Sequence, residues 1–187
     1  MPAVAARRYL KERNITPYLL VHPKLVEDFE PVPGGAPGAV VVGDAGENFS
    51  YDNLNTAYRV LSSGAEFLAL ACNRSFRDND GKLSLDAGPF VAALEYATGR
   101  QAIVFGKPSA AFFRESLTSI DQTADKVVMV GDDVEADVGA GMALGLSGIL
   151  VRTGKYQTGD EMKIEPQPTA IVADLSEAVS WVLAQDR

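Results

Sequence analysis

The sequence has very little cysteine or histidine, with one residue of each type among 187. With Cys72 alone no disulfide can form within the chain, and with His22 alone a Cys–His or Ser–His pair has only one available base. Cys72 follows the apolar run 67–71 and is interpreted as a small core residue. His22 follows the apolar run 19–21 and is interpreted as a turn residue. Nucleophilic catalysis by a thiol or by a histidine-activated serine is therefore not expected.

Positive charge and long apolar runs are also scarce. Lysine and arginine together number 17 against 25 aspartates and glutamates, which gives a formal net charge of −8. This balance argues against nucleic acid or an anionic membrane as a partner. We find no signal peptide and no apolar run long enough to span a bilayer, so the cytoplasm is the expected location.

Apolar runs alternate with helical patterns along the chain, which predicts an α/β fold. Ser50 is the predicted N-cap of one helix, and Asp174 with Glu177 forms a predicted capping box before the last one. The proline- and glycine-rich residues 31–38 predict a loop, and the Asp-Gly pair within residues 77–82 predicts a hairpin turn. The patterns predict helices at 4–13, 51–61, 90–98 and 110–119, and strands at 18–21, 39–42, 66–71, 127–130 and 170–172.

The most informative segment joins a short apolar run to a cluster of acids. Residues 127–130 predict a buried parallel strand, Asp132 and Asp133 follow it directly, and Asp137 lies near the start of a helix predicted to continue through 138–144. Ligands of open parallel sheets bind at the carboxyl ends of the strands. Converging carboxylates there require a cation, and oxygen ligands suit Mg²⁺. The alternative is that Asp133 only caps the helix in a solvated acidic turn.

A second informative segment places a lysine at the start of a helix. Lys107 lies between a glycine and a proline, after an apolar run at 102–105 and before the helix predicted at 110–119. A cation near the positive end of a helix dipole is unfavourable unless an anion lies there too. A phosphate group would satisfy both the lysine and the helix N-terminus. The alternative is an ordinary surface lysine in a turn.

Together the two segments resemble motifs III and IV of the haloacid dehalogenase-like (HAD) phosphohydrolases. The resemblance covers nearly the whole chain and favours the branch of the family that carries a C2-type cap. It implies a cap domain with an α/β fold at residues 1–99 and the C-terminal half of a Rossmann-like HAD core at residues 100–187. Further segments that resemble this branch are Gly148–Tyr156, Gly88–Val91, Ala93–Gly99, Gly43–Asp44 and Phe49–Tyr51.

The resemblance also implies roles for three residues. Asp132 would ligate Mg²⁺ as the metal residue of the site, and Asp137 would support the metal or hold Lys107 in place. Lys107 would act in catalysis and substrate binding, by neutralising the nucleophile and the phosphoryl oxygens. The implied partner is a small phosphorylated substrate or a phosphoprotein, without nucleic acid or membrane, and a homodimer is allowed.

The chain departs from the family pattern at its nucleophile. Family members carry an Asp-x-Asp motif at the end of their first strand, and no apolar strand ahead of Asp132 ends in this motif. The nearest imitation of such a strand end, at Asp44, has glycine at its last position. We therefore expect a phosphatase in truncated form that is inactive alone, and the alternative is a non-catalytic binding or regulatory module. A receiver-like domain is disfavoured. Its acidic pair would lie near the first strand and its lysine late in the chain, whereas here Lys107 precedes the acids.

Overall fold

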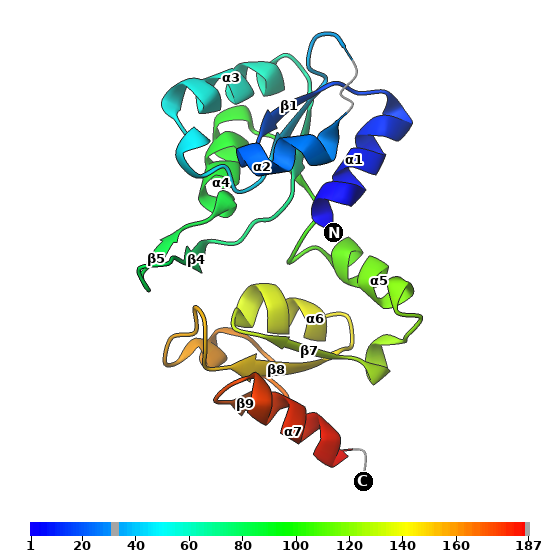
Figure 1. The fold of residues 1–187 in the computed structure, drawn as a ribbon, viewed down its shortest axis with the longest axis vertical. Coiled ribbons are helices and arrows are strands. Elements are labelled where there is room, and N and C mark those ends of the chain that lie inside the picture. Colours follow the sequence, from blue (N-terminus) through cyan, green and yellow to red (C-terminus); the bar gives the residue numbers. More distant parts are fainter. Residues whose placement is uncertain (31–33, 186–187) are drawn as a thin grey trace. The chain divides into compact units, whose positions relative to one another are not determined.

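The structure is a computed structural model that describes residues 1–30 and 34–185 (Figure 1). Part of the predicted loop at 31–38 lies outside the described residues. The helices are α1 (Pro2–Arg13), α2 (Pro23–Val26), α3 (Tyr51–Ser62), α4 (Ala87–Thr98), α5 (Ala110–Ser119), α6 (Ala140–Met142) and α7 (Leu175–Gln185). The strands are β1 (Pro17–Leu20), β2 (Ala39–Val42), β3 (Glu66–Ala69), β4 (Ser75–Arg77), β5 (Leu83–Leu85), β6 (Ile103–Val104), β7 (Val128–Gly131), β8 (Ser147–Val151) and β9 (Ala170–Val172). Short helical turns are η1 (Glu27–Phe29), η2 (Gly46–Asn48), η3 (Ala124–Lys126), η4 (Val134–Gly139) and η5 (Asp160–Lys163).

The chain divides into two compact units. Unit 1 comprises Met1–Phe76 and Ser84–Gly106, and unit 2 comprises Arg77–Leu83 and Lys107–Arg187. None of the described helices combines the length and the apolar character needed to cross a bilayer. The expected boundary between a cap at 1–99 and a core at 100–187 stays a prediction. In the structure β6 pairs with β3, so the change of unit falls after Gly106.

Unit 1 is a parallel four-stranded sheet between helices. Its strand order is β1-β2-β3-β6, and all four residues of β2 are buried. Because side chains alternate along a strand, Val40 and Val42 pack on one face and Val41 packs on the other. The first face is covered by α3 and α4 through Leu61 and Leu94, and the second by α1 through residues such as Leu10. Such two-sided burial is the reason why β2 is apolar throughout.

Unit 2 has a smaller sheet, with three parallel strands in the order β7-β8-β9. On one face of β8, Leu150 packs against Val134 and Val138 of η4, which follows β7 directly. On the other face, Ile149 packs with residues of α7, including the half-buried Trp181. Figure 1 shows α6 and α7 on opposite faces of this sheet. The mixed α/β fold with parallel sheets confirms the predicted fold class.

The local predictions agree with the structure except after β7. Ser50 caps α3 by accepting the Asn53 N–H, and Asp174 accepts the Glu177 N–H at the start of α7. The helix predicted through 138–144 is instead a π-helical turn at Val134–Gly139, followed by the short α6. A π-helical turn is rare and is frequently found at functional sites.

Candidate active site

The candidate site is built at the carboxyl end of β7. The valine-rich β7 ends at Gly131, and the chain then enters the π-helical turn η4. The N–H groups of Asp137 and Val138 both donate to the Asp133 carbonyl oxygen, at 3.0 and 3.2 Å. This turn brings Asp137 back beside the end of the strand, so a Cβ atom at Gly131 would collide with the Asp137 side chain. Glycine is therefore required at position 131 by close approach.

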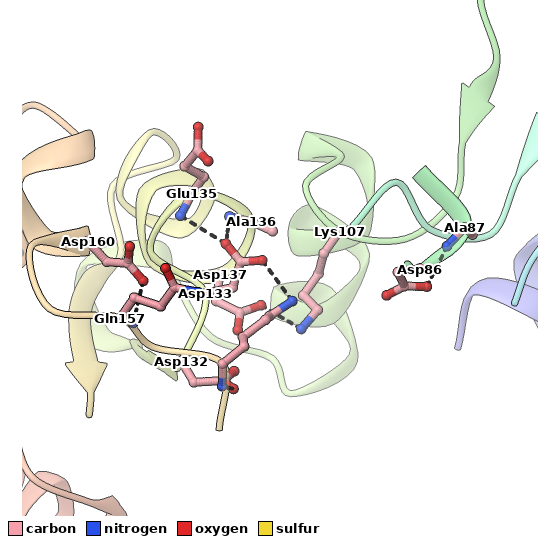
Figure 2. Close-up of polar contacts among 11 residues, drawn as sticks. Asp86, Ala87, Lys107, Asp132, Asp133, Glu135, Ala136, Asp137, Gln157 and Asp160 are labelled. Atoms are coloured by element: carbon pink, nitrogen blue, oxygen red, sulfur yellow. Dashed lines mark hydrogen bonds and ion pairs between the residues drawn. The ribbon is translucent and has the colours of Figure 1, made fainter. Parts of the chain in front are cut away.

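The structure brings Lys107 and Asp137 together. The Lys107 ammonium lies 2.5 Å from Asp137 Oδ1, and Asp137 is only 4% exposed (Figure 2). Lys107 stands before Ser109, the N-cap of α5, as predicted. The anion that accompanies this lysine in the structure is thus a buried carboxylate. A buried carboxylate needs such a partner, because an unpaired charge is costly to remove from water.

Asp133 caps the start of η4, the alternative role that the sequence allows for it. Its Oδ1 atom accepts the N–H groups of Glu135 and Ala136 at 3.1 and 2.8 Å (Figure 2). Its Oδ2 atom lies 2.8 Å from the Lys155 ammonium, in a pair whose lysine and aspartate side chains are 17% and 21% exposed. Both oxygens of Asp133 are therefore engaged within unit 2.

The pKa values of this pair move apart. Burial alone raises the pKa of Asp133, but the hydrogen bond from the Ala136 N–H and the contact with Lys155 together hold that pKa below its ordinary value. Burial likewise disfavours the charged form of Lys155. The hydrogen bond to Asp133, and the negative charges of Asp133, Asp132 and Asp137, outweigh it and raise the pKa of Lys155. Both groups are consequently charged at neutral pH.

Asp132 is held in a different way. Its Oδ2 atom accepts the backbone N–H of Lys155 at 2.8 Å, and the chain approaches it at Gly154 so closely that any Cβ there would overlap Oδ2. Gly154 also has a φ of +56°, which favours glycine. Asp132 therefore receives a neutral donor, whereas Asp133 and Asp137 each receive a lysine ammonium.

These contacts test whether the site fits a metal ion. Asp132 supplies a hard carboxylate oxygen that forms no ion pair in the contacts above, which is the donor chemistry that Mg²⁺ prefers. Within residues 1–30 and 34–185, however, no group of three or more acidic, histidine or cysteine side chains is arranged to hold a metal. The residues fit Mg²⁺ in kind, and they supply only part of a complete ligand set.

His22 and Cys72, for which the sequence predicts no catalytic role, have ordinary environments. His22 caps the short α2, with Nδ1 accepting the Lys24 N–H at 3.2 Å. Cys72 is half-buried, and burial together with the negative charges of Glu95 and Asp86 raises its pKa to about 11. A thiol with such a high pKa is a poor nucleophile at neutral pH.

Sequence reasoning missed Lys155 and Asp160 as parts of this region. Asp160 is 8% exposed, accepts the Gln157 N–H at 2.8 Å and pairs with Lys163 at 2.7 Å, so it orders the segment that follows β8. The position of Lys155 in the chain could have indicated that it lies at the site. It follows the strand next to β7 in sequence, and the carboxyl ends of neighbouring parallel strands meet at one edge.

Comparison with known proteins places the chain in a family. A sequence model of the HAD-hydrolase-like family matches residues 104–178, which include β7, η4 and Lys107. The chain is 45% identical over 185 residues to the phospholysine phosphohistidine inorganic pyrophosphate phosphatase of Danio rerio, covering 97% of this chain and 68% of that protein. It is 44% identical over 179 residues to haloacid dehalogenase-like hydrolase domain-containing protein 2 of Rattus norvegicus, covering 96% of this chain and 69% of that protein.

Solved structures show the same fold. A 4-nitrophenylphosphatase from Thermotoga maritima matches with a TM-score of 0.81 and 27% identity, over 96% of this chain and 70% of that one. A glycerol phosphate phosphatase from Mycobacterium tuberculosis, solved in complex with magnesium, matches with a TM-score of 0.75 and 28% identity, over 94% of this chain and 56% of that one. The chain belongs to the haloacid dehalogenase-like hydrolase family.

Proposed function

We propose that this chain provides the lysine and acidic motifs of a Mg²⁺-dependent phosphohydrolase that acts through an aspartyl-phosphate. The main support is the ion pair of 2.5 Å between Lys107 and Asp137, at the strand end that also bears Asp132. A positive charge held against a buried carboxylate beside an oxygen ligand is suited to binding a phosphoryl group. The names of the matched relatives support this activity.

Each residue has a defined task in this proposal. Asp137 keeps the Lys107 ammonium at the strand end, where the ammonium neutralises oxygens of a bound phosphoryl group. Asp132 would hold Mg²⁺, which when bound would neutralise charge on the same group. Gly131 allows Asp137 to approach the strand end, and so it fixes the position of the lysine indirectly.

Mg²⁺ is expected to bind this chain weakly. Asp132 is one carboxylate, and each ligand that a complete site would add contributes about tenfold or more in affinity, which corresponds to ~1.4 kcal/mol. A calorimetric titration is expected to give millimolar binding that Asp132→Ala abolishes. Micromolar binding that survives this substitution would contradict the assignment of Asp132.

We further propose that the 187-residue chain does not turn over substrate by itself. The Asp-x-Asp spacing does occur at Asp78 and Asp80, but these residues lie in the turn between β4 and β5. There their carboxylates accept the N–H groups of Asn79 and Lys82. They do not end a buried strand, which is where the family carries its nucleophile.

A non-catalytic binding or regulatory module is the second candidate. One observation favours it: the described residues do not gather three metal-binding side chains, and both lysines of the site already have carboxylate partners. Such a site is electrostatically satisfied without a metal. Three expectations stay predictions: a small phosphorylated substrate or a phosphoprotein as the partner, a cytoplasmic location, and a homodimer.

A chimaera distinguishes the two candidates. It places a strand that ends in the family's Asp-x-Asp motif ahead of Met1 and is assayed with p-nitrophenyl phosphate beside the chain itself. We expect background hydrolysis from the chain and Mg²⁺-dependent turnover from the chimaera. Lys107→Ala is expected to reduce that turnover by about 10²–10³-fold, because it removes a preorganised charge from the transition state. Lys126→Ala, at an exposed lysine of unit 2, serves as the control.

Two results would contradict the proposal. A folded chimaera without turnover would favour the binding module. Mg²⁺-dependent turnover by the chain alone, lost in Lys107→Ala, would mean that these residues contain a nucleophile that sequence reasoning did not find.

A further inference from the structure

Lys155 has contacts that the proposed function does not use. It follows β8, and it reaches both aspartates that follow β7 by two different groups. Its backbone N–H donates to Asp132 Oδ2 at 2.8 Å, and its ammonium lies 2.8 Å from Asp133 Oδ2. A surface lysine would pair with one acid and remain in water. This one is largely withdrawn from water, with a side chain that is 17% exposed.

The backbone next to Lys155 is shaped for the same contact. Gly154 has a left-handed φ of +56°, and a side chain at this position would overlap Asp132 Oδ2. The close approach of the loop to Asp132 thus depends on glycine, independently of the ion pair with Asp133. Two separate features of the loop therefore act on two adjacent carboxylates.

We propose that Lys155 is a positioning residue of the acidic site, whose ammonium holds Asp133 away from a bound cation while its amide orients Asp132 toward it. The inference rests on the proposed function in one respect, the assignment of Asp132 as the ligand of the cation. It adds that two neighbouring aspartates have different roles. Asp133 caps η4 with one oxygen and holds Lys155 with the other, and Asp132 remains for the cation.

The electrostatic consequence has a definite sign. Removing the Lys155 charge releases Asp133 Oδ2 and adds one uncompensated negative charge beside Asp132, so a divalent cation should bind more tightly. Removing the Asp133 charge leaves the ammonium without its carboxylate partner, so a cation should bind more weakly. A lysine that stabilises the fold away from the acidic site would give no gain in affinity when it is removed.

The test measures cation affinity in the 187-residue chain, with Mn²⁺ as the probe and the paramagnetic broadening of amide signals as the readout. Lys155→Met retains the backbone N–H and side-chain length, and it is expected to raise affinity about fivefold. Asp133→Asn retains the cap and is expected to lower affinity by about the same factor. The double variant is expected to return to the wild-type value, and Lys155→Arg is expected to match the wild type.

Lys163→Met is the matched control, since Lys163 pairs with Asp160 at 2.7 Å in the same unit. It is expected to leave Mn²⁺ affinity unchanged. Should Lys155→Met fail to fold, the double variant with Asp133→Asn is used, because it leaves neither charge unpaired. Its Mn²⁺ affinity is compared with that of Asp133→Asn alone. Adding Lys155→Met is expected to raise affinity about fivefold.

The outcomes separate the two proposals. Binding that depends on Asp132 but is unchanged or weakened by Lys155→Met would overturn the role of Lys155 alone. Binding of Mn²⁺ that does not depend on Asp132, or no binding at all, would overturn the metal assignment in the proposed function and this inference with it.

Discussion

The two units differ in how fully their sheets are covered. In unit 1 the central strand β2 is completely buried, with helices packed on both faces. In unit 2 the central strand β8 is buried at four of its five residues, but β7, the edge strand that leads into the candidate site, has no fully buried residue. Each face of this sheet is covered by a small apolar cluster. The charged residues of the candidate site all lie in unit 2. A site at a strand end needs access for its ligand, so the unit that carries it has less apolar burial to stabilise it.

A core substitution in each unit should give the largest contrast. Ile149→Ala in unit 2 and Leu68→Ala in unit 1 each remove a fully buried side chain, at a cost of about 3 kcal/mol. We expect Ile149→Ala to unfold unit 2 at temperatures where unit 1 stays folded. Trp181 is the single tryptophan and packs against Ile149, so its fluorescence reports on unit 2, while circular dichroism reports on both units.

The reverse substitution completes this comparison. Leu68→Ala should lower the unfolding temperature of unit 1 and leave the Trp181 transition in place. A single transition, seen by both probes in both variants, would show that the units unfold together. It would contradict a difference in stability between them.

Gly131→Ala tests the close approach at the candidate site. Its Cβ would overlap the Asp137 side chain, so we expect a loss of about 2 kcal/mol from unit 2 and displacement of Asp137 from Lys107. The control is Gly34→Ala in unit 1, where a Cβ would meet no atom within 4 Å. Equal stability of the two variants in chemical denaturation would contradict the packing argument.

Asp133→Asn tests the buried ion pair through pH. The substitution keeps the cap and removes the charge, and we expect it to cost unit 2 about 2 kcal/mol at neutral pH. Because the folded pKa of Asp133 is lowered, its contribution is complete above the unfolded value of ~3.9 and is lost as the pH falls through the folded value. Because the folded pKa of Lys155 is raised, its contribution is complete below ~10.4 and is lost as the pH rises through the folded value.

The pair therefore stabilises unit 2 from about pH 4 to about pH 10. Denaturation of the wild type and Asp133→Asn across this range, followed by Trp181 fluorescence, measures the difference. A difference that disappears already at pH 6 would assign the effect to another group.

Hydrogen exchange should show the smallest effect and sharpens the comparison within the sheets. Strand β7 pairs only with β8 among the described strands, whereas β2 lies between β1 and β3. We expect the amides of Val128–Val130 to exchange at least tenfold faster than those of Val40–Val42, a difference of about 1.4 kcal/mol in opening. Equal protection would contradict the view of β7 as a weakly covered strand.

The sequence by itself determined much of the local structure. Runs of β-branched residues predicted the strands, and Ser50 and Asp174 marked helix starts, because apolar periodicity and capping act over a few residues. The position of acids after an apolar strand, and of Lys107 before a helix, also indicated where a site would form. These signals depend only on neighbours in the chain.

Tertiary structure alone decided which charges meet. The family resemblance implied the contact of Asp137 with Lys107 as one of two roles for Asp137, but no local pattern in the residues encodes it. This pairing, and that of Lys155 with Asp133, depends on segments distant in sequence meeting at the end of β7. The π-helical turn was also unforeseen, because packing of Val134 and Val138 on Leu150 decides it together with the close contact at Gly131. The strand of residues 103–104 joined the sheet of unit 1 for a similar reason, since its partner β3 lies far away in sequence. Long-range pairing and packing thus assigned separate roles to aspartates that the sequence could only place side by side.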